Sequence, residues 1–87
     1  MKRAEVLDTA RQYVTVDRQS THGRPEDTFA AIADLWNAYL PIDLTPVDVA
    51  NLMALLKIAR ARQNPSHMDN YVDGAGYLAC AAELAER

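Results

Sequence analysis

The sequence has little cysteine and few aromatic residues, and it has no excess of basic residues. Its one cysteine, Cys80, cannot form an intramolecular disulfide, which favours a reducing, intracellular setting. A formal net charge of −3 with no block of Lys or Arg argues against a partner such as duplex nucleic acid. No apolar run reaches the roughly 18 residues of a membrane span, and no apolar stretch follows the charged N-terminus as in a signal peptide. We therefore expect a soluble, cytoplasmic protein without a membrane partner.

What the chain does contain is a helix-forming composition. Ala and Leu dominate the 49% of residues that are hydrophobic, whereas Phe and Trp occur once each. The length of 87 residues fits one small helical domain spanning residues 1–87. A domain this small buries only about 60% of the surface that its unfolded chain exposes. So large an apolar share in so small a body predicts a homo-oligomer, either a dimer or a higher assembly.

Four helical segments are predicted, at about residues 3–16, 25–40, 46–62 and 68–85. Pro25 and Pro46 suit the first turn of a helix, and Thr45 and Asp48 have the spacing of a capping box. The link at residues 63–66 is short, so the last two helices are expected to be antiparallel neighbours. The predicted fold class is all-α, a four-helix domain built from antiparallel helical hairpins.

Apolar residues at helical spacing predict which face of each helix is buried. The stripes of the first, second and fourth helices are Val6, Leu7, Ala10, Tyr13 and Val14; Phe29, Ile32, Ala33, Trp36 and Leu40; and Tyr71, Val72, Ala75, Leu78, Ala79 and Ala82. The apolar residues of the third helix surround much of its circumference and are Val49, Leu52, Met53, Leu55, Leu56 and Ile58. The third helix is apolar on more than one side, which places it at the centre of the fold or at an oligomer interface. Gly74 and Gly76 cost helix propensity, and they predict a close approach of another helix or of a ligand.

Two basic and two acidic residues stand out on the last two helices. Lys57 and Arg60 are three residues apart, and Asp69 and Asp73 are four apart, so each pair shares a helix face. Antiparallel packing would bring the two pairs together. They form either an internal ion-pair network or a polar pocket, in which the aspartates bind Mg²⁺ and the basic residues bind phosphate. The sequence leaves both interpretations open.

Other candidate binding residues lie near the second helix and on the fourth. His22 and Arg24 flank Gly23 just before the helix N-terminus at Pro25, an arrangement that binds anions or forms a solvated loop. Glu26 is a further carboxylate that can face inward. Tyr77 stacks on a base or packs in the core, and Cys80 is expected to be a small buried hydrophobe. We assign no catalytic residue, because no nucleophile–base pair is present.

Several segments together resemble an uncharacterised family of small helical proteins from phages and prophages. The resemblance covers nearly the whole chain and is carried by residues 21–27, Phe29, Ile32–Ala33, Leu35–Trp36, Asp48–Ala50, Leu55–Arg60 and Asp69–Tyr77. More distantly, the helical plan is similar to the MazG-like all-α nucleotide pyrophosphohydrolases. Those enzymes hold Mg²⁺ with carboxylates from two helices and cleave nucleoside triphosphates to monophosphate and pyrophosphate.

The MazG-like resemblance implies roles for the candidate residues and also shows departures. It implies Mg²⁺ as cofactor. The implied ligands are Asp69, Asp73 and Glu26 for the metal, and Lys57, Arg60, His22, Arg24 and Tyr77 for the nucleotide. Asp69 and Asp73 stand where the enzymes carry an ExxD pair, and no ExxE pair precedes them, so the chain offers fewer carboxylates than those enzymes gather.

Three hypotheses follow for the function. The first is a phage-derived, MazG-like nucleotide-binding protein that acts as a Mg²⁺-dependent pyrophosphohydrolase. The second is a non-enzymatic module that binds or sequesters a nucleotide and so antagonises host defence. The third is a structural or adaptor oligomer. The first two predict a nucleotide or another phosphate-bearing small molecule as partner, in the cytoplasm of the host cell.

Overall fold

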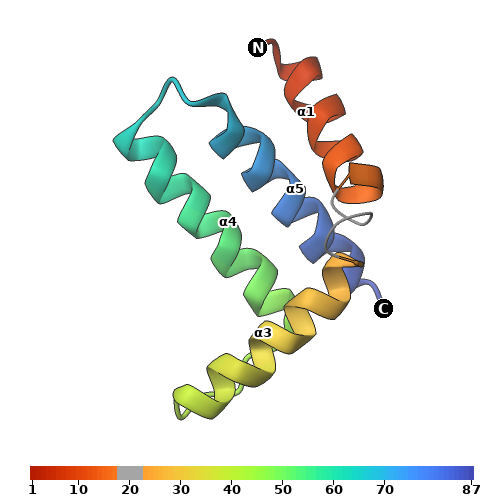
Figure 1. Ribbon diagram of the computed structural model, residues 1–87, viewed down its shortest axis with the longest axis vertical. Helices are drawn as coiled ribbons and strands as arrows, with labels where there is room; N and C mark the ends of the chain where they lie inside the picture. Colours follow the sequence, from red (N-terminus) through yellow and green to blue (C-terminus); the bar gives the residue numbers. More distant parts are fainter. Residues whose placement is uncertain (18–22) are drawn as a thin grey trace.

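The computed structural model describes residues 1–17 and 23–87, and every regular element in these ranges is a helix (Figure 1). The elements are α1 (Arg3–Gln12), the π-helical segment η1 (Tyr13–Asp17), α3 (Pro25–Tyr39), α4 (Pro46–Gln63) and α5 (Met68–Ala85). The prediction of an all-α fold with four helices is confirmed for the described residues, as are the bounds of the last helix. None of the described helices is long and apolar enough to cross a membrane.

The first helix differs from the prediction at its C-terminal end. It changes from α to π geometry at Tyr13 instead of continuing as an α-helix to Val16. The segment is rich in β-branched residues, which fit an α-helix less well. The Thr15 hydroxyl donates a hydrogen bond to the Arg11 carbonyl at 2.6 Å, a side-chain bond that competes with the regular backbone ladder. The π turn aims Tyr13 and Val14 towards the cavity described below.

The antiparallel hairpin of α4 and α5 is the central unit of the fold (Figure 1). Its first helix begins at the predicted capping box. The Thr45 backbone N–H donates to Asp48 Oδ2 at 2.9 Å, and the Asp48 N–H donates to Thr45 Oγ1 at 3.2 Å. Pro46 occupies the first turn, where its missing N–H costs nothing. The capping box therefore fixes where α4 begins, as the sequence predicts.

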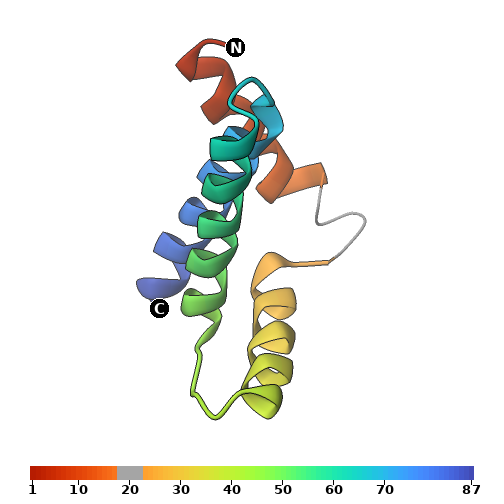
Figure 2. The same ribbon diagram turned by 90° about the vertical axis from the view of Figure 1, so that its left-hand side faces the viewer.

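The other two helices pack on this hairpin at different places. α1 lies alongside α5, and α3 packs across the opposite end against α4 (Figure 1). Turned by 90°, α3 stands to one side of the hairpin, and its C-terminal end projects beyond it (Figure 2). Asn37 stabilises the following loop, because its amide donates to the Leu44 carbonyl at 2.9 Å and its carbonyl accepts from the Leu44 N–H at 2.7 Å.

The core is made of small side chains. Its main cluster contains Phe29, Ala33, Val49, Ala50, Cys80 and Ala81. The largest fully buried side chains are only Val49 and Val72. Thin side chains allow close packing of helices but bury little apolar area per residue, so this core supplies a modest part of the stability.

The predicted buried stripes of α1, α3 and α5 need correction, and on α4 Leu52, Leu55, Leu56 and Ile58 are exposed. Leu7 is exposed because α1 is packed only along the side that contains Ala10. Leu40 is exposed because the chain leaves the helix there. On α5 the predicted stripe is rotated: Tyr71, Leu78, Ala79 and Ala82 face outwards, and the buried face is formed by Asn70, Val72, Gly76, Cys80 and Ala81.

Of the two glycines of α5, Gly76 confirms the predicted close approach and Gly74 does not. A Cβ on Gly76 would lie 2.9 Å from Val14 Cγ1, closer than carbon atoms pack, and a Cβ on Gly74 would lie 3.6 Å from Lys57 Cβ. Gly76 therefore sets how near α5 lies to the segment after α1. Gly74 sits at an ordinary contact distance from α4.

We predict opposite effects for alanine at these two positions. Gly76→Ala should lower the free energy of unfolding by about 1–3 kcal/mol, because the new methyl group overpacks against Val14. Gly74→Ala should raise it by about 0.5–1 kcal/mol, because alanine favours the helix and the contact is tolerated. Urea unfolding followed by circular dichroism measures both. Equal effects of the same sign would contradict this packing.

Candidate functional site

A half-buried ion pair joins the two helices of the hairpin. Lys57 Nζ on α4 lies 3.0 Å from Asp73 Oδ2 on α5, and the two side chains are only 14% and 19% exposed. The pair forms beside Gly74, where an added Cβ would lie at an ordinary contact distance from Lys57. One basic and one acidic member of the predicted set of four therefore meet, as the antiparallel arrangement requires.

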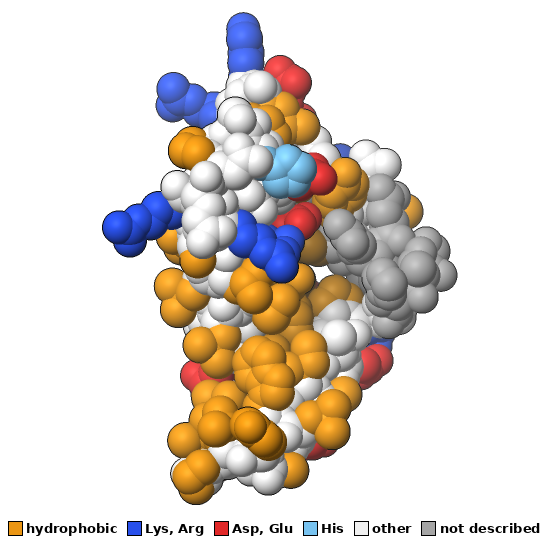
Figure 3. All heavy atoms as spheres, turned by 60° about the vertical axis from the view of Figure 1, so that its left-hand side comes forward, with side chains coloured by type: hydrophobic (Ala, Val, Ile, Leu, Met, Phe, Trp, Pro, Cys, Tyr) orange, Lys and Arg blue, Asp and Glu red, His pale blue; other side chains and the backbone are white. Residues whose placement is uncertain are grey.

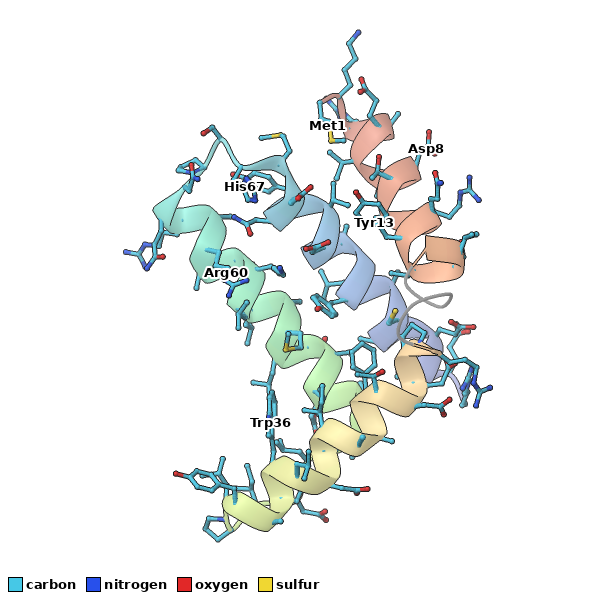
Figure 4. All side chains as sticks on the ribbon, viewed as in Figure 1. Met1, Asp8, Tyr13, Trp36, Arg60 and His67 are labelled. Carbon is cyan, nitrogen blue, oxygen red and sulfur yellow. The ribbon has the colours of Figure 1, made fainter. Side chains whose placement is uncertain are left out.

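The ion pair lies in the wall of a cavity of about 310 Å³. The remaining wall is mostly apolar and comes from every helix of the structure. Its larger side chains are Tyr13, Val14, Phe29, Ile32, Met53, Val72, Tyr77 and Cys80. Figure 4 shows Tyr13 between α1 and α5. The rings of Phe29 and Tyr77 are 6.0 Å apart and inclined by 54°, so Tyr77 belongs both to the core and to the cavity wall.

The other two members of the predicted set form no ion pair with any residue that the structure describes. Arg60 and Asp69 are both exposed, and no ion pair within residues 1–17 and 23–87 involves either residue. Arg60 follows Lys57 by three residues on α4, and Asp69 precedes Asp73 by four on α5, so each lies one turn away from the buried pair. Among the described residues, the predicted set therefore forms the Lys57–Asp73 ion pair, and the other two charges, one turn away, lie open to solvent.

Glu26 lies in a different environment. It is half-buried, 3.5 Å from Arg24 Nε and 3.4 Å from Arg87 Nη2, and it borders a second cavity next to Arg11 and Glu83. The structure does not bring it to Asp69 and Asp73. In the part of the chain that the structure describes, no group of three or more His, Cys, Asp or Glu side chains is arranged to hold a metal ion.

In the segment before α3, the structure describes Gly23 and Arg24. Arg24 is exposed and makes two hydrogen bonds to Asp27, with distances of 3.1 and 3.2 Å. The hydrogen bond and the negative charge of Asp27, followed by the charge of Glu26, raise the pKa of Arg24. The guanidinium is thus already matched by two carboxylates. Gly23 has a φ of +77°, which turns the chain into α3, and His22 lies outside the described residues.

Sequence reasoning missed several cavity residues. Tyr13, Phe29, Met53 and Val72 all occur at helical spacing, a pattern that predicts core packing equally well. The two glycines on α5 indicate close packing and not a hollow, because the space beside Gly76 is filled by Val14.

Cys80 is buried, as predicted, and lies between the two cavities. Burial, then the negative charges of Glu83 and Glu26, raise the pKa of its thiol. A raised pKa leaves less of the reactive thiolate at any pH below it. The residue is therefore expected to behave as an apolar wall residue and not as a nucleophile.

We predict that Cys80 is alkylated slowly by iodoacetamide in the native protein. The rate should rise only at higher pH than for the same protein unfolded in urea, because the pKa of the folded-state thiol is raised. Mass spectrometry of samples quenched over time gives the two pH profiles. Coincident profiles would contradict the environment assigned to Cys80.

We predict unequal effects for the two aspartates of α5. Asp73→Asn should lower the free energy of unfolding by about 1–2 kcal/mol, because it leaves the half-buried Lys57 without its charge partner. Asp69→Asn is the matched control and should change it by less than about 0.5 kcal/mol, because Asp69 is exposed. Thermal or urea unfolding of both variants tests the difference. A larger loss for Asp69→Asn would overturn the assignment.

Comparison with known proteins gives the family but no activity. The chain is 37% identical over 81 residues to the Gene 55 protein of Mycobacterium phage D29, covering 93% of this chain and 54% of that protein. It is 42% identical over 73 residues to the Gene 55 protein of Mycobacterium phage L5, covering 83% of this chain and 47% of that protein.

The chain thus spans about half the length of these curated relatives. No solved structure shows a significant match. Residues 5–85 match the family described as "Domain of unknown function (DUF6378)". The predicted likeness to small helical phage proteins is therefore confirmed at the level of the family, and the chain belongs to DUF6378.

Proposed function

We propose that this protein binds a nucleotide without cleaving it, with the base in the cavity between the four helices. The observation that carries the proposal is the Lys57–Asp73 pair in the wall of that cavity. A volume of about 310 Å³ lies at the lower end of the roughly 300–1,000 Å³ typical of small-molecule pockets. A single ring system with its sugar suits such a space better than a polymer does.

The apolar wall of the cavity favours the binding of a planar ligand. Tyr13, Phe29 and Tyr77 border the cavity from three different helical segments. The face of a nucleobase packs well against aromatic rings, and such stacking contributes about 1–3 kcal/mol per base. Every base has such a face, so this part of the site favours the class of ligand and not one particular base.

The ion pair can form hydrogen bonds with the polar edge of the same ligand. Lys57 offers N–H donors and Asp73 offers carboxylate acceptors, only 3.0 Å apart. A nucleobase also presents donors and acceptors side by side along its edge, so it can bond to both groups without separating their charges. Because the pair is half-buried, these charge-assisted bonds are stronger than bonds made in open water.

Arg60 is the residue proposed to contact phosphate. It is exposed one turn along α4 from Lys57, and no ion pair among the described residues neutralises it. Its guanidinium can bind a phosphate group through two parallel hydrogen bonds. A nucleotide with its base in the cavity would extend its phosphates to this side of α4.

The arrangement of carboxylates favours binding over hydrolysis. Asp73 borders the cavity, Asp69 lies one turn away in solvent, and Glu26 is held by two arginines. We propose that the helical plan is MazG-like and that this site keeps nucleotide recognition with a reduced set of metal ligands. Asp69 and Asp73 would hold any Mg²⁺ that accompanies the phosphates. A phage-encoded protein of this kind would sequester nucleotides in the host cytoplasm.

Isothermal titration with a panel of nucleosides, monophosphates and triphosphates, with and without Mg²⁺, tests the proposal. We expect binding to the wild-type protein and a loss of at least tenfold in affinity for Lys57→Met, since the donor to the base edge is removed. Arg60→Ala should weaken the binding of triphosphates more than the binding of nucleosides. Arg62→Ala is the matched control, because Arg62 is also exposed near the end of α4 but points to a different side.

Product analysis separates binding from catalysis. The titrated samples, resolved by anion exchange, should contain intact triphosphate. Monophosphate and pyrophosphate that disappear in Asp73→Asn would favour the pyrophosphohydrolase hypothesis instead. If the folded wild-type protein binds no member of the panel, the nucleotide-binding proposal and the pyrophosphohydrolase hypothesis are both contradicted. The adaptor hypothesis then remains.

A further inference from the structure

α4 has a second apolar face, directed away from both the core and the cavity. We call it the α4 outer face and define it as Leu52, Leu55, Leu56 and Ile58, which are 38%, 58%, 38% and 60% exposed. The helix buries Val49, Ala50 and Ala54 on its other side. Tyr39, Leu40 and Ile42, which precede α4 in the sequence, are also exposed. In Figure 3 hydrophobic side chains cover one half of this side of the molecule, and Lys and Arg project from the other half.

The exposed area is larger than a monomer of this size requires. The chain exposes 6117 Å² at a mass of 9.7 kDa, whereas folded monomers of that mass expose about 5,100 Å². Its radius of gyration is 13.3 Å, against about 12 Å expected for a compact domain of this length. The excess of about 1,000 Å² is close to the roughly 800 Å² that each partner buries in a standard stable interface.

The order of residues along α4 suits antiparallel pairing with α4 of a second copy of the chain. Asp48, Leu55 and Arg62 are seven residues apart, so they follow one line along the helix, with Leu52 and Ile58 on either side of Leu55. Antiparallel pairing of two such helices about Leu55 sets Asp48 of one copy beside Arg62 of the other. It also sets Leu52 against Ile58. A two-fold interface requires this self-complementarity.

We propose that a second copy of this chain covers the α4 outer face, with the two α4 helices antiparallel about a two-fold axis at Leu55. Met53 and Lys57 face the cavity from the opposite side of α4. The interface and the nucleotide site therefore use different sides of one helix. Failure of either proposal leaves the other standing.

Sedimentation equilibrium of the 87-residue protein tests the proposal. The wild-type protein should have twice the mass of 9.7 kDa, and Leu55→Glu should have the monomer mass, because a buried charge would face its own copy. Leu7→Glu is the matched control. Leu7 is 62% exposed, similar to Leu55, but lies on α1. Circular dichroism confirms that each variant keeps its helical content.

Crosslinking tests the register independently of stability. A residue on a two-fold axis meets its own copy, so Leu55→Cys should form a disulfide-linked dimer on mild oxidation, whereas Leu7→Cys should not. Charge reversal in Arg62→Glu should raise the dimer dissociation constant at least tenfold, and Arg60→Glu should leave it unchanged. A monomeric wild-type protein would overturn the proposal, as would a dimer unaffected by Leu55→Glu.

Discussion

The close packing of α5 against its neighbours is the constraint on which the rest of the structure depends. Gly76 lets Val14 approach to a distance that no side chain would permit, and Gly74 lies against Lys57 of α4. Across the hairpin, Lys57 and Asp73 lie 3.0 Å apart. The position of η1 against α5 depends on Gly76, and the core between the helices is likewise built from small residues.

The same constraint explains both cavities and the exposed apolar surface. Small core residues fill little volume, and α1, α3, α4 and α5 border a cavity that is partly open to solvent. They also leave the larger aliphatic residues without a place inside, and four of these lie on the outer side of α4. A thin core, a partly open cavity and an apolar surface therefore occur together with small core residues.

Local signals in the sequence determine much of the fold. Thr45, Pro46 and Asp48 predict the start of α4, because capping depends only on neighbouring residues. The buried face of α5 could not be predicted in the same way. Its stripe of larger apolar residues faces outwards, because Gly76, Cys80 and Ala81 permit the closer packing. The sequence pattern reports hydrophobicity, whereas packing here depends on size.

The candidate site was predicted in part for a similar reason. Helical spacing and the short link predict that Lys57 and Asp73 can meet, and they do. Spacing alone does not show that Arg60 and Asp69 stay in solvent, or that Glu26 turns to Arg87 from the far end of the chain. Contacts between segments that are distant in the sequence cannot be predicted without the three-dimensional arrangement of the helices. The aromatic wall of the cavity could not be distinguished from core by periodicity.

The central claim is that the cavity beside Lys57 and Asp73 accepts a nucleobase. Nuclear Overhauser effects between the base protons of a bound nucleotide and the side chains of the protein test it most directly. The account predicts contacts from the base to the rings of Tyr77 and Phe29, which line the cavity. Contacts confined to exposed residues, with none to these two rings, would contradict it.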